Sequence, residues 1–132
     1  MSMRGFFKVS VCVALMLAMC GCGRPTFIGT DAAVYSGGKL YAVSGQDLNS
    51  VYVATVAALQ QLEIEVTDTA KDVFYAKVVG KVADGRTVTI RIKPGAENVT
   101  DLRIKSGTFG NEERSRVIYK QIQQNLKTGS NK

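Results

Sequence analysis

The side chains that most often carry catalysis are scarce in this chain. Its 132 residues include no His and no Trp, and its three Cys residues all lie within the first 22 positions. A Ser-His-Asp or Cys-His arrangement therefore cannot form, and the body of the protein lacks the Cys and His ligands of a typical zinc site. Acid-base chemistry would have to use paired carboxylates or a Ser-Lys pair.

Each carboxylate that could belong to such a pair has a simpler structural role, because it caps a helix, shapes a turn or keeps one face of a strand in solvent. These residues are Asp47, Glu63, Glu65, Asp84, Glu112 and Glu113. No cluster of oxygen ligands has the loop spacing of a calcium or magnesium site. We therefore predict a protein that is not an enzyme, with no catalytic residue, no metal and no cofactor.

The N-terminal residues are typical of a secretory signal peptide. Arg4 and Lys8 give a positive start, and residues 9–19 (VSVCVALMLAM) form an apolar run that ends among small residues. A membrane span needs roughly 20 apolar residues, so this run is too short to cross a bilayer. A buried N-terminal helix is the alternative, but basic residues flank only one side of the run. We predict a signal peptide over residues 1–21.

Two cysteines at the end of this run compete for covalent lipid attachment. The stretch resembles the lipobox of bacterial lipoproteins, in which a small residue precedes a cysteine that is lipidated and becomes the mature N-terminus. Cys22 follows Gly21 and fits this pattern, whereas Cys20 follows the bulkier Met19. We predict a lipoprotein signal peptide and lipidation at Cys22, with Cys20 as the alternative. Gly23 after the cysteine, in place of Asp, is similar to the outer-membrane sorting pattern of cells with two membranes.

Export and lipidation limit the partners that this protein can meet. The full chain carries 17 Lys and Arg residues against 11 Asp and Glu residues. An exported domain does not normally meet nucleic acid, so the basic charge does not indicate a nucleic-acid partner. Several acyl chains would hold the protein in the membrane permanently. We expect a location in the cell envelope, with membrane contact through the lipid anchor.

The stretch after the anchor has little regular pattern. Residues 22–38 contain Pro25 and several Gly without a sustained hydrophobic period, which predicts a flexible tether. A small hairpin that pairs residues 33–35 with residues 40–42 is the alternative. Residues 39–44 (KLYAVS) alternate in part and predict a first strand.

Two segments have the spacing of helices with one buried face. Asp47 is a good N-cap for a helix over residues 48–62. A second helix begins after Asn111, with Glu112 and Glu113 in its first turn, where carboxylates oppose the positive end of the helix dipole. The buried stripes are predicted to be Leu48, Val51, Tyr52, Thr55, Ala58, Leu59 and Leu62 in the first helix, and Val117, Ile118, Ile122 and Leu126 in the second.

The middle of the chain alternates apolar and polar residues, which is typical of strands with one buried and one solvated face. We predict strands over residues 63–67, 73–83, 86–93 and 99–105, with a turn at residues 68–71. Asp84-Gly85 is a strong hairpin signal, because Gly tolerates the positive φ of a two-residue turn. The side chains predicted to face the core are Ile64, Val66, Phe74, Ala76, Val78, Val82, Val88, Ile90, Ile92, Leu102 and Ile104.

Residues 107–110 (GTFG) stand just before the second helix. We predict a tight structural turn with Phe109 packed into the core. An anion-binding turn at the helix N-terminus is the alternative, but Glu112 and Glu113 already supply negative charge there.

The element order is β-α-β-β-β-β-α. Both helices have a single apolar stripe and need the buried face of the sheet, so we predict a two-layer α+β domain with an antiparallel sheet and both helices on one face. The domain covers residues 39–127, and residues 128–132 should fray.

With this order in hand, the chain resembles the family of small bacterial lipoproteins known as domain of unknown function 3568. The matching stretches are residues 48–65 (LNSVYVATVAALQQLEIE), 83–92 (ADGRTVTIRI) and 104–115 (IKSGTFGNEERS). The resemblance implies export, lipidation and a compact α+β domain. It implies no activity and no site residues.

Basic side chains gather on the predicted solvent face of the sheet. The candidate binding residues are Lys77, Lys81, Arg91, Lys93, Arg103 and Lys105. Such a face could rest on anionic lipid headgroups or an acidic envelope polymer, although an ordinary solvated face is the simpler interpretation. We predict a lipid-anchored envelope protein that acts by binding. The alternative is an accessory subunit of a larger envelope complex with a protein partner, and an enzyme ranks third.

Overall fold

The computed structural model of this protein describes residues 33–130. The predicted signal peptide over residues 1–21 and the lipidation site at Cys22, with its alternative Cys20, lie outside these residues. The first part of the predicted tether and the last two residues of the predicted frayed tail lie outside them as well.

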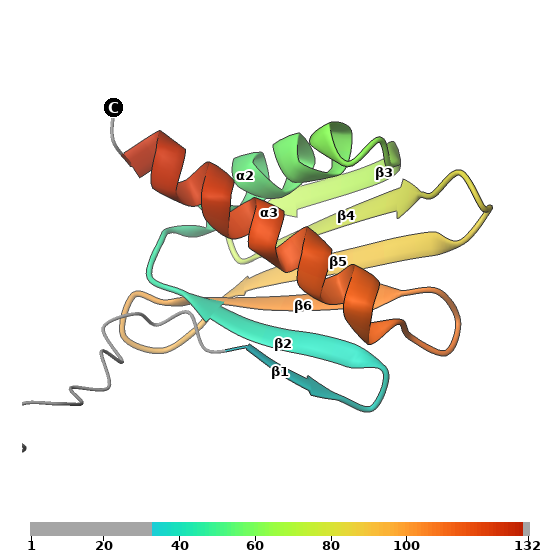
Figure 1. Ribbon diagram of the computed structural model, residues 1–132. Helices are drawn as coiled ribbons and strands as arrows, with labels where there is room; N and C mark the ends of the chain where they lie inside the picture. Colours follow the sequence, from blue (N-terminus) through green and yellow to red (C-terminus); the bar gives the residue numbers. More distant parts are fainter. Residues whose placement is uncertain (1–32, 131–132) are drawn as a thin grey trace, which may run out of the picture.

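In the described part of the chain, six strands and two helices form one α+β domain (Figure 1). They are β1 (Ala33–Ser36), β2 (Lys39–Ser44), α2 (Leu48–Gln61), β3 (Glu65–Asp72), β4 (Tyr75–Lys81), β5 (Thr87–Pro94), β6 (Thr100–Ser106) and α3 (Glu112–Ser130). The strands make one antiparallel sheet in the order β1-β2-β6-β5-β4-β3, and both helices cover the same face of it. The predicted two-layer fold is confirmed, with one strand added before the predicted element order.

The additional strand is β1, which forms a hairpin with β2. Its register pairs Tyr35 with Leu40, as in the hairpin alternative. The turn residues Gly37 and Gly38 have φ values of 57° and 79°, which Gly adopts without steric cost. The sheet therefore begins at Ala33, and the prediction of a tether that extends to Gly38 is wrong for these last six residues.

The β3–β4 hairpin also differs from its prediction. The turn predicted at residues 68–71 is part of β3, which continues to Asp72, and the chain reverses at Val73 and Phe74. β3 is an edge strand with mostly exposed side chains, so its polar composition is also typical of a turn. Phe74 was predicted to face the core but is 77% exposed at this hairpin turn.

The core lies between the sheet and the two helices. Alternate strand residues point into it, and Val78, Ile90 and Ile104 are fully buried there. Leu59 of α2 and Ile118 of α3 pack onto them from the helix layer. Because these residues belong to one sheet and its two helices, residues 33–130 contain a hydrophobic core of their own, as an independently folding domain does.

Both predicted helix caps are confirmed. The carboxylate of Asp47 accepts a hydrogen bond from the backbone N–H of Ser50 at 3.3 Å, at the start of α2. The side-chain oxygen of Asn111 accepts one from the backbone N–H of Arg114 at 2.9 Å, at the start of α3. Each bond satisfies a backbone donor that the first turn of a helix leaves unpaired.

The buried stripe of α3 is shifted from its prediction. Val117 is 49% exposed, whereas Tyr119 is buried beside Ile118 and Ile122. The stripe thus follows the positions three and four residues apart, and Val117 lies to one side of it. α3 also continues to Ser130, beyond the predicted end of the domain at residue 127.

The loop at residues 107–110 is a structural turn, but Phe109 is not part of the core. Its side chain is 94% exposed. The loop is held instead by close backbone packing, because a Cβ atom on Gly110 would lie 2.3 Å from the carbonyl oxygen of Gly38. Gly110 also has a φ of 86°, a value that favours glycine. The two adjoining turns therefore interlock through their glycines.

Candidate anion-binding face

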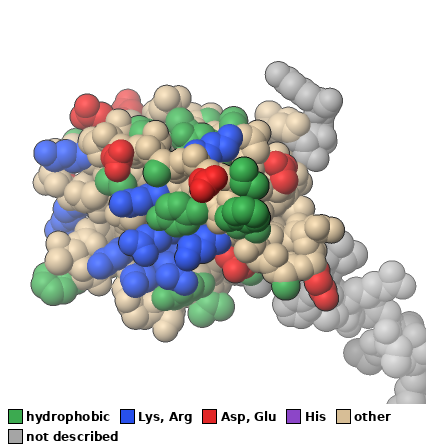
Figure 2. Space-filling view, turned by 180° about the vertical axis from the view of Figure 1, so that it is seen from behind, with side chains coloured by type: hydrophobic (Ala, Val, Ile, Leu, Met, Phe, Trp, Pro, Cys, Tyr) green, Lys and Arg blue, Asp and Glu red, His purple; other side chains and the backbone are tan. Residues whose placement is uncertain are grey.

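The helices leave the other face of the sheet open, and basic side chains gather on it. We define the basic face as Lys39, Lys77, Lys81, Arg91, Lys93, Arg103 and Lys105. It contains all six residues predicted as candidates, and the structure adds Lys39. Figure 2, which views the molecule from behind the sheet, shows these blue side chains beside a smaller apolar area.

Three of these residues form a row across three neighbouring strands. Lys77 of β4 lies opposite Arg91 of β5, which lies opposite Arg103 of β6. Directly opposed side chains in an antiparallel sheet have Cβ atoms about 4.5–5.5 Å apart, and like charges at this spacing destabilise the sheet. We call Lys77, Arg91 and Arg103 the cationic row.

At the borders of the basic face, some basic residues lie opposite an acidic residue. Lys93 lies opposite Asp101, and Lys81 lies opposite Glu65. No residue of the cationic row has an acidic cross-strand partner. Within residues 33–130, the ion pairs involve Arg86, Arg114 and Arg116, and none involves the basic face. The positive charge at its centre is therefore uncompensated within the described domain.

A small hollow lies at the centre of the basic face. It has a volume of about 220 Å³, and its lining residues are Lys39, Thr89, Arg91, Arg103 and Lys105. Four of these five residues are cationic, the fifth supplies a hydroxyl group, and none is acidic. Lys39, Thr89 and Lys105 are half-buried, while the two arginines are exposed. We call this depression the cationic hollow.

A second hollow of about 410 Å³ adjoins it and shares Arg91 and Arg103. Its lining also includes Lys93 and Asp101, and the part formed by β1 and β2 is apolar, with Val34, Tyr41 and Val43. The guanidinium carbon of Arg103 lies 5.0 Å from the centre of the Tyr41 ring. A cation–π contact of this kind holds the guanidinium in place while leaving N–H groups free to donate.

Lys39 and Tyr41 were missed at the sequence level. The signal that identifies them is the alternation of β2, where Leu40 and Ala42 are buried, so Lys39 and Tyr41 must point to the opposite side. Their position beside β6 depends on the pairing of Leu40 with Ile104, two residues that are far apart in the chain.

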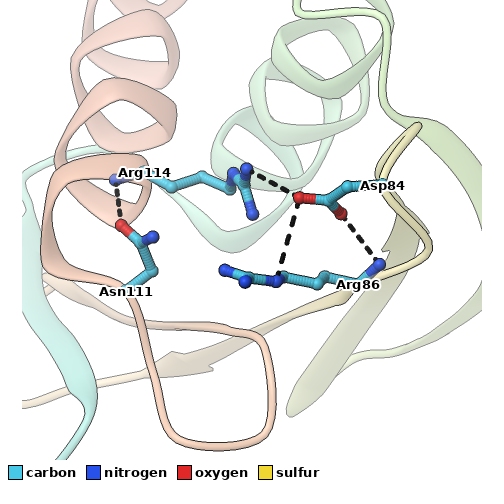
Figure 3. Close-up of polar contacts among 4 residues, drawn as sticks. All are labelled: Asp84, Arg86, Asn111 and Arg114. Atoms are coloured by element: carbon cyan, nitrogen blue, oxygen red, sulfur yellow. Dashed lines mark hydrogen bonds and ion pairs between the residues drawn. The ribbon is translucent and has the colours of Figure 1, made fainter.

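At one end of the sheet, by contrast, one carboxylate is paired with two arginines (Figure 3). Asp84, in the β4–β5 turn, accepts a hydrogen bond from the guanidinium of Arg114 at 3.1 Å and another from the backbone N–H of Arg86 at 2.9 Å. The hydrogen bond from the backbone of Arg86 has the largest effect on the Asp84 carboxyl and lowers its pKa, and the bond from Arg114 lowers it further. Asn111 caps α3 next to it. This cluster joins the turn to the helix and gives Asp84 a structural role.

The described residues also include a further hollow, but no metal-ligand cluster and no helix able to span a membrane. Between residues 33 and 130, no three His, Cys, Asp or Glu side chains lie close enough to hold a metal ion. Among these same residues, neither helix has the length and hydropathy needed to span a membrane. A further hollow, of about 670 Å³, lies along α2 and α3 and is lined mainly by small residues and neutral amides such as Gln61, Gln121 and Asn125.

We compared the chain with protein-family models and with curated proteins. A family model described as a protein of unknown function (DUF3568) matches residues 6–125. No curated protein matches the chain. The family match covers most of the sequence, including every element of the sheet, and it confirms the predicted membership of this family of unknown function. The chain therefore belongs to the DUF3568 family of proteins of unknown function.

Proposed function

We propose that this protein is a lipid-anchored protein of the cell envelope and that its domain is a binding module without catalytic activity. Its ligand is an anionic surface, formed by lipid headgroups or an acidic envelope polymer, and contact is made through the basic face. The observation that carries this proposal is the cationic row. Lys77, Arg91 and Arg103 stand opposite one another without an ion-pair partner in the described domain.

The energetics favour an anionic partner for this row. A Lys or Arg near an anionic membrane surface contributes about 1 kcal/mol to binding, so the three residues together contribute about 3 kcal/mol. That free energy corresponds to roughly a hundredfold change in affinity. A bound anion would also relieve the repulsion between the like charges of the row.

The lipid anchor would keep the domain near such a surface. Residues 22–32 are the 11 residues from Cys22 to the start of β1. Even fully extended, a chain of this length reaches at most about 40 Å. β1 belongs to the same sheet as the basic face, and its residue Val34 borders the hollow beside Arg103. In a cell with two membranes, Gly23 favours the outer one.

The anchor is tested by metabolic labelling with a fatty acid in cells that produce the full-length chain. We expect label in the wild-type protein and in Cys20→Ser, and no label in Cys22→Ser. Label that persists in Cys22→Ser and disappears in Cys20→Ser would show that Cys20 is the lipidated residue. Absence of label from the wild-type protein would contradict lipidation altogether.

The basic face is tested with the chain from residue 23 onward, which contains the whole described domain. We expect it to sediment with vesicles of phosphatidylglycerol and phosphatidylcholine but not with pure phosphatidylcholine. Replacing the cationic row by Gln (Lys77→Gln, Arg91→Gln, Arg103→Gln) should weaken binding by roughly a hundredfold.

The matched control removes three positive charges from the opposite side of the molecule, with Arg116→Gln, Lys120→Gln and Lys127→Gln on the exposed side of α3. This variant has the same net charge as the row variant, and we expect it to bind almost as well as the wild type. Equal losses in the two variants would mean that net charge, not the basic face, governs binding.

A second function, as a subunit of a larger envelope complex, is favoured by one observation. Phe109 is 94% exposed in a loop that its glycines hold in place, and an exposed aromatic side chain on a rigid loop is suited to contact a protein. A photoreactive phenylalanine analogue at position 109 should then crosslink to one protein in cells. The same analogue at Lys120 is the control, and equal crosslinking from both positions would contradict a specific interface.

A further inference from the structure

We propose that the cationic hollow is a binding site for a phosphate group, either inorganic phosphate or the terminal phosphate of a phosphomonoester. The inference rests on the proposed function of the basic face and names the chemistry of its ligand. The hollow brings together Lys39, Thr89, Arg91, Arg103 and Lys105 from three neighbouring strands.

The register of the sheet explains why these groups converge. Thr89 and Lys105 lie opposite each other on β5 and β6, and Arg91 and Arg103 are the next opposed pair on the same face. Lys39 completes the group from β2, next to the pair that Leu40 makes with Ile104. Four cationic side chains and a hydroxyl group thus surround one point on the sheet.

The donor set matches a phosphate better than a carboxylate. A phosphomonoester carries a charge of about −1.5 to −2 at neutral pH and three strong acceptor oxygens. A carboxylate carries a single charge on two oxygens. One guanidinium group can donate two parallel hydrogen bonds to two oxygens of a phosphate, and a lysine ammonium adds a point charge. Among residues 33–130, no acidic side chain lines the hollow, so none competes with a bound anion for these four cations.

The size and shelter of the hollow also suit this ligand. A volume of about 220 Å³ equals the share of about seven molecules of liquid water, which is room for a phosphate group and its first attached atoms. Lys39 and Lys105 are half-buried, so part of each side chain is already covered by its neighbours in the sheet. Arg103 is already held by Tyr41, which lowers the ordering that binding would require.

The adjoining hollow indicates where the remainder of an organic phosphate would lie. It shares Arg91 and Arg103 with the cationic hollow and continues to the side chains of Val34, Tyr41 and Val43. A group attached to the phosphate could therefore rest on this apolar wall. Inorganic phosphate would use the cationic hollow alone, so the two sources of phosphate are distinguishable.

The test uses the full-length protein in non-ionic detergent and isothermal titration calorimetry at constant ionic strength. The probes are inorganic phosphate, glycerol 1-phosphate and acetate. We expect both phosphates to bind more tightly than acetate. Tighter binding of glycerol 1-phosphate than of inorganic phosphate assigns the site to an organic phosphate, and mixed micelles with phosphatidic acid then test whether a lipid headgroup binds still more tightly. Equal affinities for the two phosphates assign it to the free ion.

Two double variants locate the site. Lys39→Gln with Lys105→Gln removes two charges from the hollow, and we expect phosphate affinity to fall about tenfold or more. Lys120→Gln with Lys127→Gln removes two charges from the exposed side of α3, outside the basic face, and should change phosphate affinity about twofold or less. Circular dichroism confirms that both variants are folded.

The outcomes separate this inference from the proposed function. Equal losses in the two double variants would mean that net charge attracts the anion, and acetate binding as tight as phosphate binding would leave only a diffuse anion-binding face. Either result would overturn the phosphate site. Failure of the wild-type protein to bind either phosphate, together with normal sedimentation on anionic vesicles, would also overturn the phosphate site alone. Failure in both experiments would overturn both proposals.

Discussion

Two rows of side chains cross the same four strands one residue apart, and their chemistry is opposite. The inner row contains Leu40, Ile104, Ile90 and Val78, and all four are fully buried beneath the helices. The outer row contains Tyr41, Arg103, Arg91 and Lys77 on the open face. A strand directs successive side chains to opposite faces, so both rows follow from the same backbone.

The difference shows which part of the sequence serves folding. The inner row must be apolar for the helices to pack on the sheet. The outer row needs only to be soluble, and threonine or alternating charges would satisfy that need, as the opposed Lys93 and Asp101 do. Three cations in register exceed what solubility requires. We therefore attribute the inner row to stability, and we propose that the cationic row serves binding.

The largest effect is expected from the inner row. Ile90→Ala removes a fully buried side chain at the centre of the sheet and should lower the free energy of unfolding by about 2–5 kcal/mol. Denaturant unfolding of the chain from residue 23 onward measures this change. Arg91→Ala, at the neighbouring position, is the control and should change stability by less than about 1 kcal/mol. Equal losses would remove the distinction between the rows.

A smaller, pH-dependent effect is expected from Asp84, whose charge is paired. Its pKa in the folded protein is lowered by hydrogen bonds from Arg86 and Arg114, so the ionised carboxylate stabilises the fold above its ordinary pKa of 3.8. This contribution is lost as the pH falls through the lowered folded-state pKa. Asp84→Asn should therefore reduce stability at neutral pH and flatten its fall in acid, measured by thermal unfolding at several pH values.

The control for Asp84→Asn is Asp68→Asn, on the exposed edge strand β3. Asp68 forms none of the ion pairs found within residues 33–130. A flattening as large in Asp68→Asn as in Asp84→Asn would contradict a specific role for the cluster at α3.

The smallest effects are expected for two substitutions in β5 that should change the free energy of unfolding in opposite directions. Arg91→Thr removes repulsion within the cationic row and should raise the free energy of unfolding by a few tenths of a kcal/mol, up to about 1. Lys93→Thr removes the residue opposite Asp101 and should lower it by a similar amount. Unfolding of both variants at low salt measures the difference. A loss of stability in Arg91→Thr as large as in Lys93→Thr would mean that the row is not under strain from its charges.

Strong local patterns made much of this architecture predictable. The alternation over residues 86–93 and 99–105 placed Arg91 and Arg103 on the open face, and polar residues before each helix identified its cap. The edge strand β3 was harder, because its exposed, polar residues lack the alternation that marks a half-buried strand. Phe109 was predicted to lie in the core because it is hydrophobic. Its hydrophobicity does not reveal that close backbone packing, and not this side chain, holds the loop.

The cationic hollow depends on information that local patterns do not contain. Lys39 reaches Lys105 only because β2 pairs with β6 after the chain has passed through α2 and three further strands. The register then sets which basic residues meet and which have acidic partners. The six basic residues of the open face were therefore predictable as a group. Which of them lie opposite an acidic residue, and which form the cationic row, was not predictable.

The most direct test of the central claim is lysine footprinting by acetylation and mass spectrometry, with the full-length protein reconstituted in vesicles with or without anionic lipid. We expect anionic lipid to protect Lys39, Lys77 and Lys105, while Lys120 and Lys127 of α3 react equally in both preparations. Protection confined to α3, or no protection at any lysine, would contradict the assignment of the open face of the sheet as the anion-binding surface.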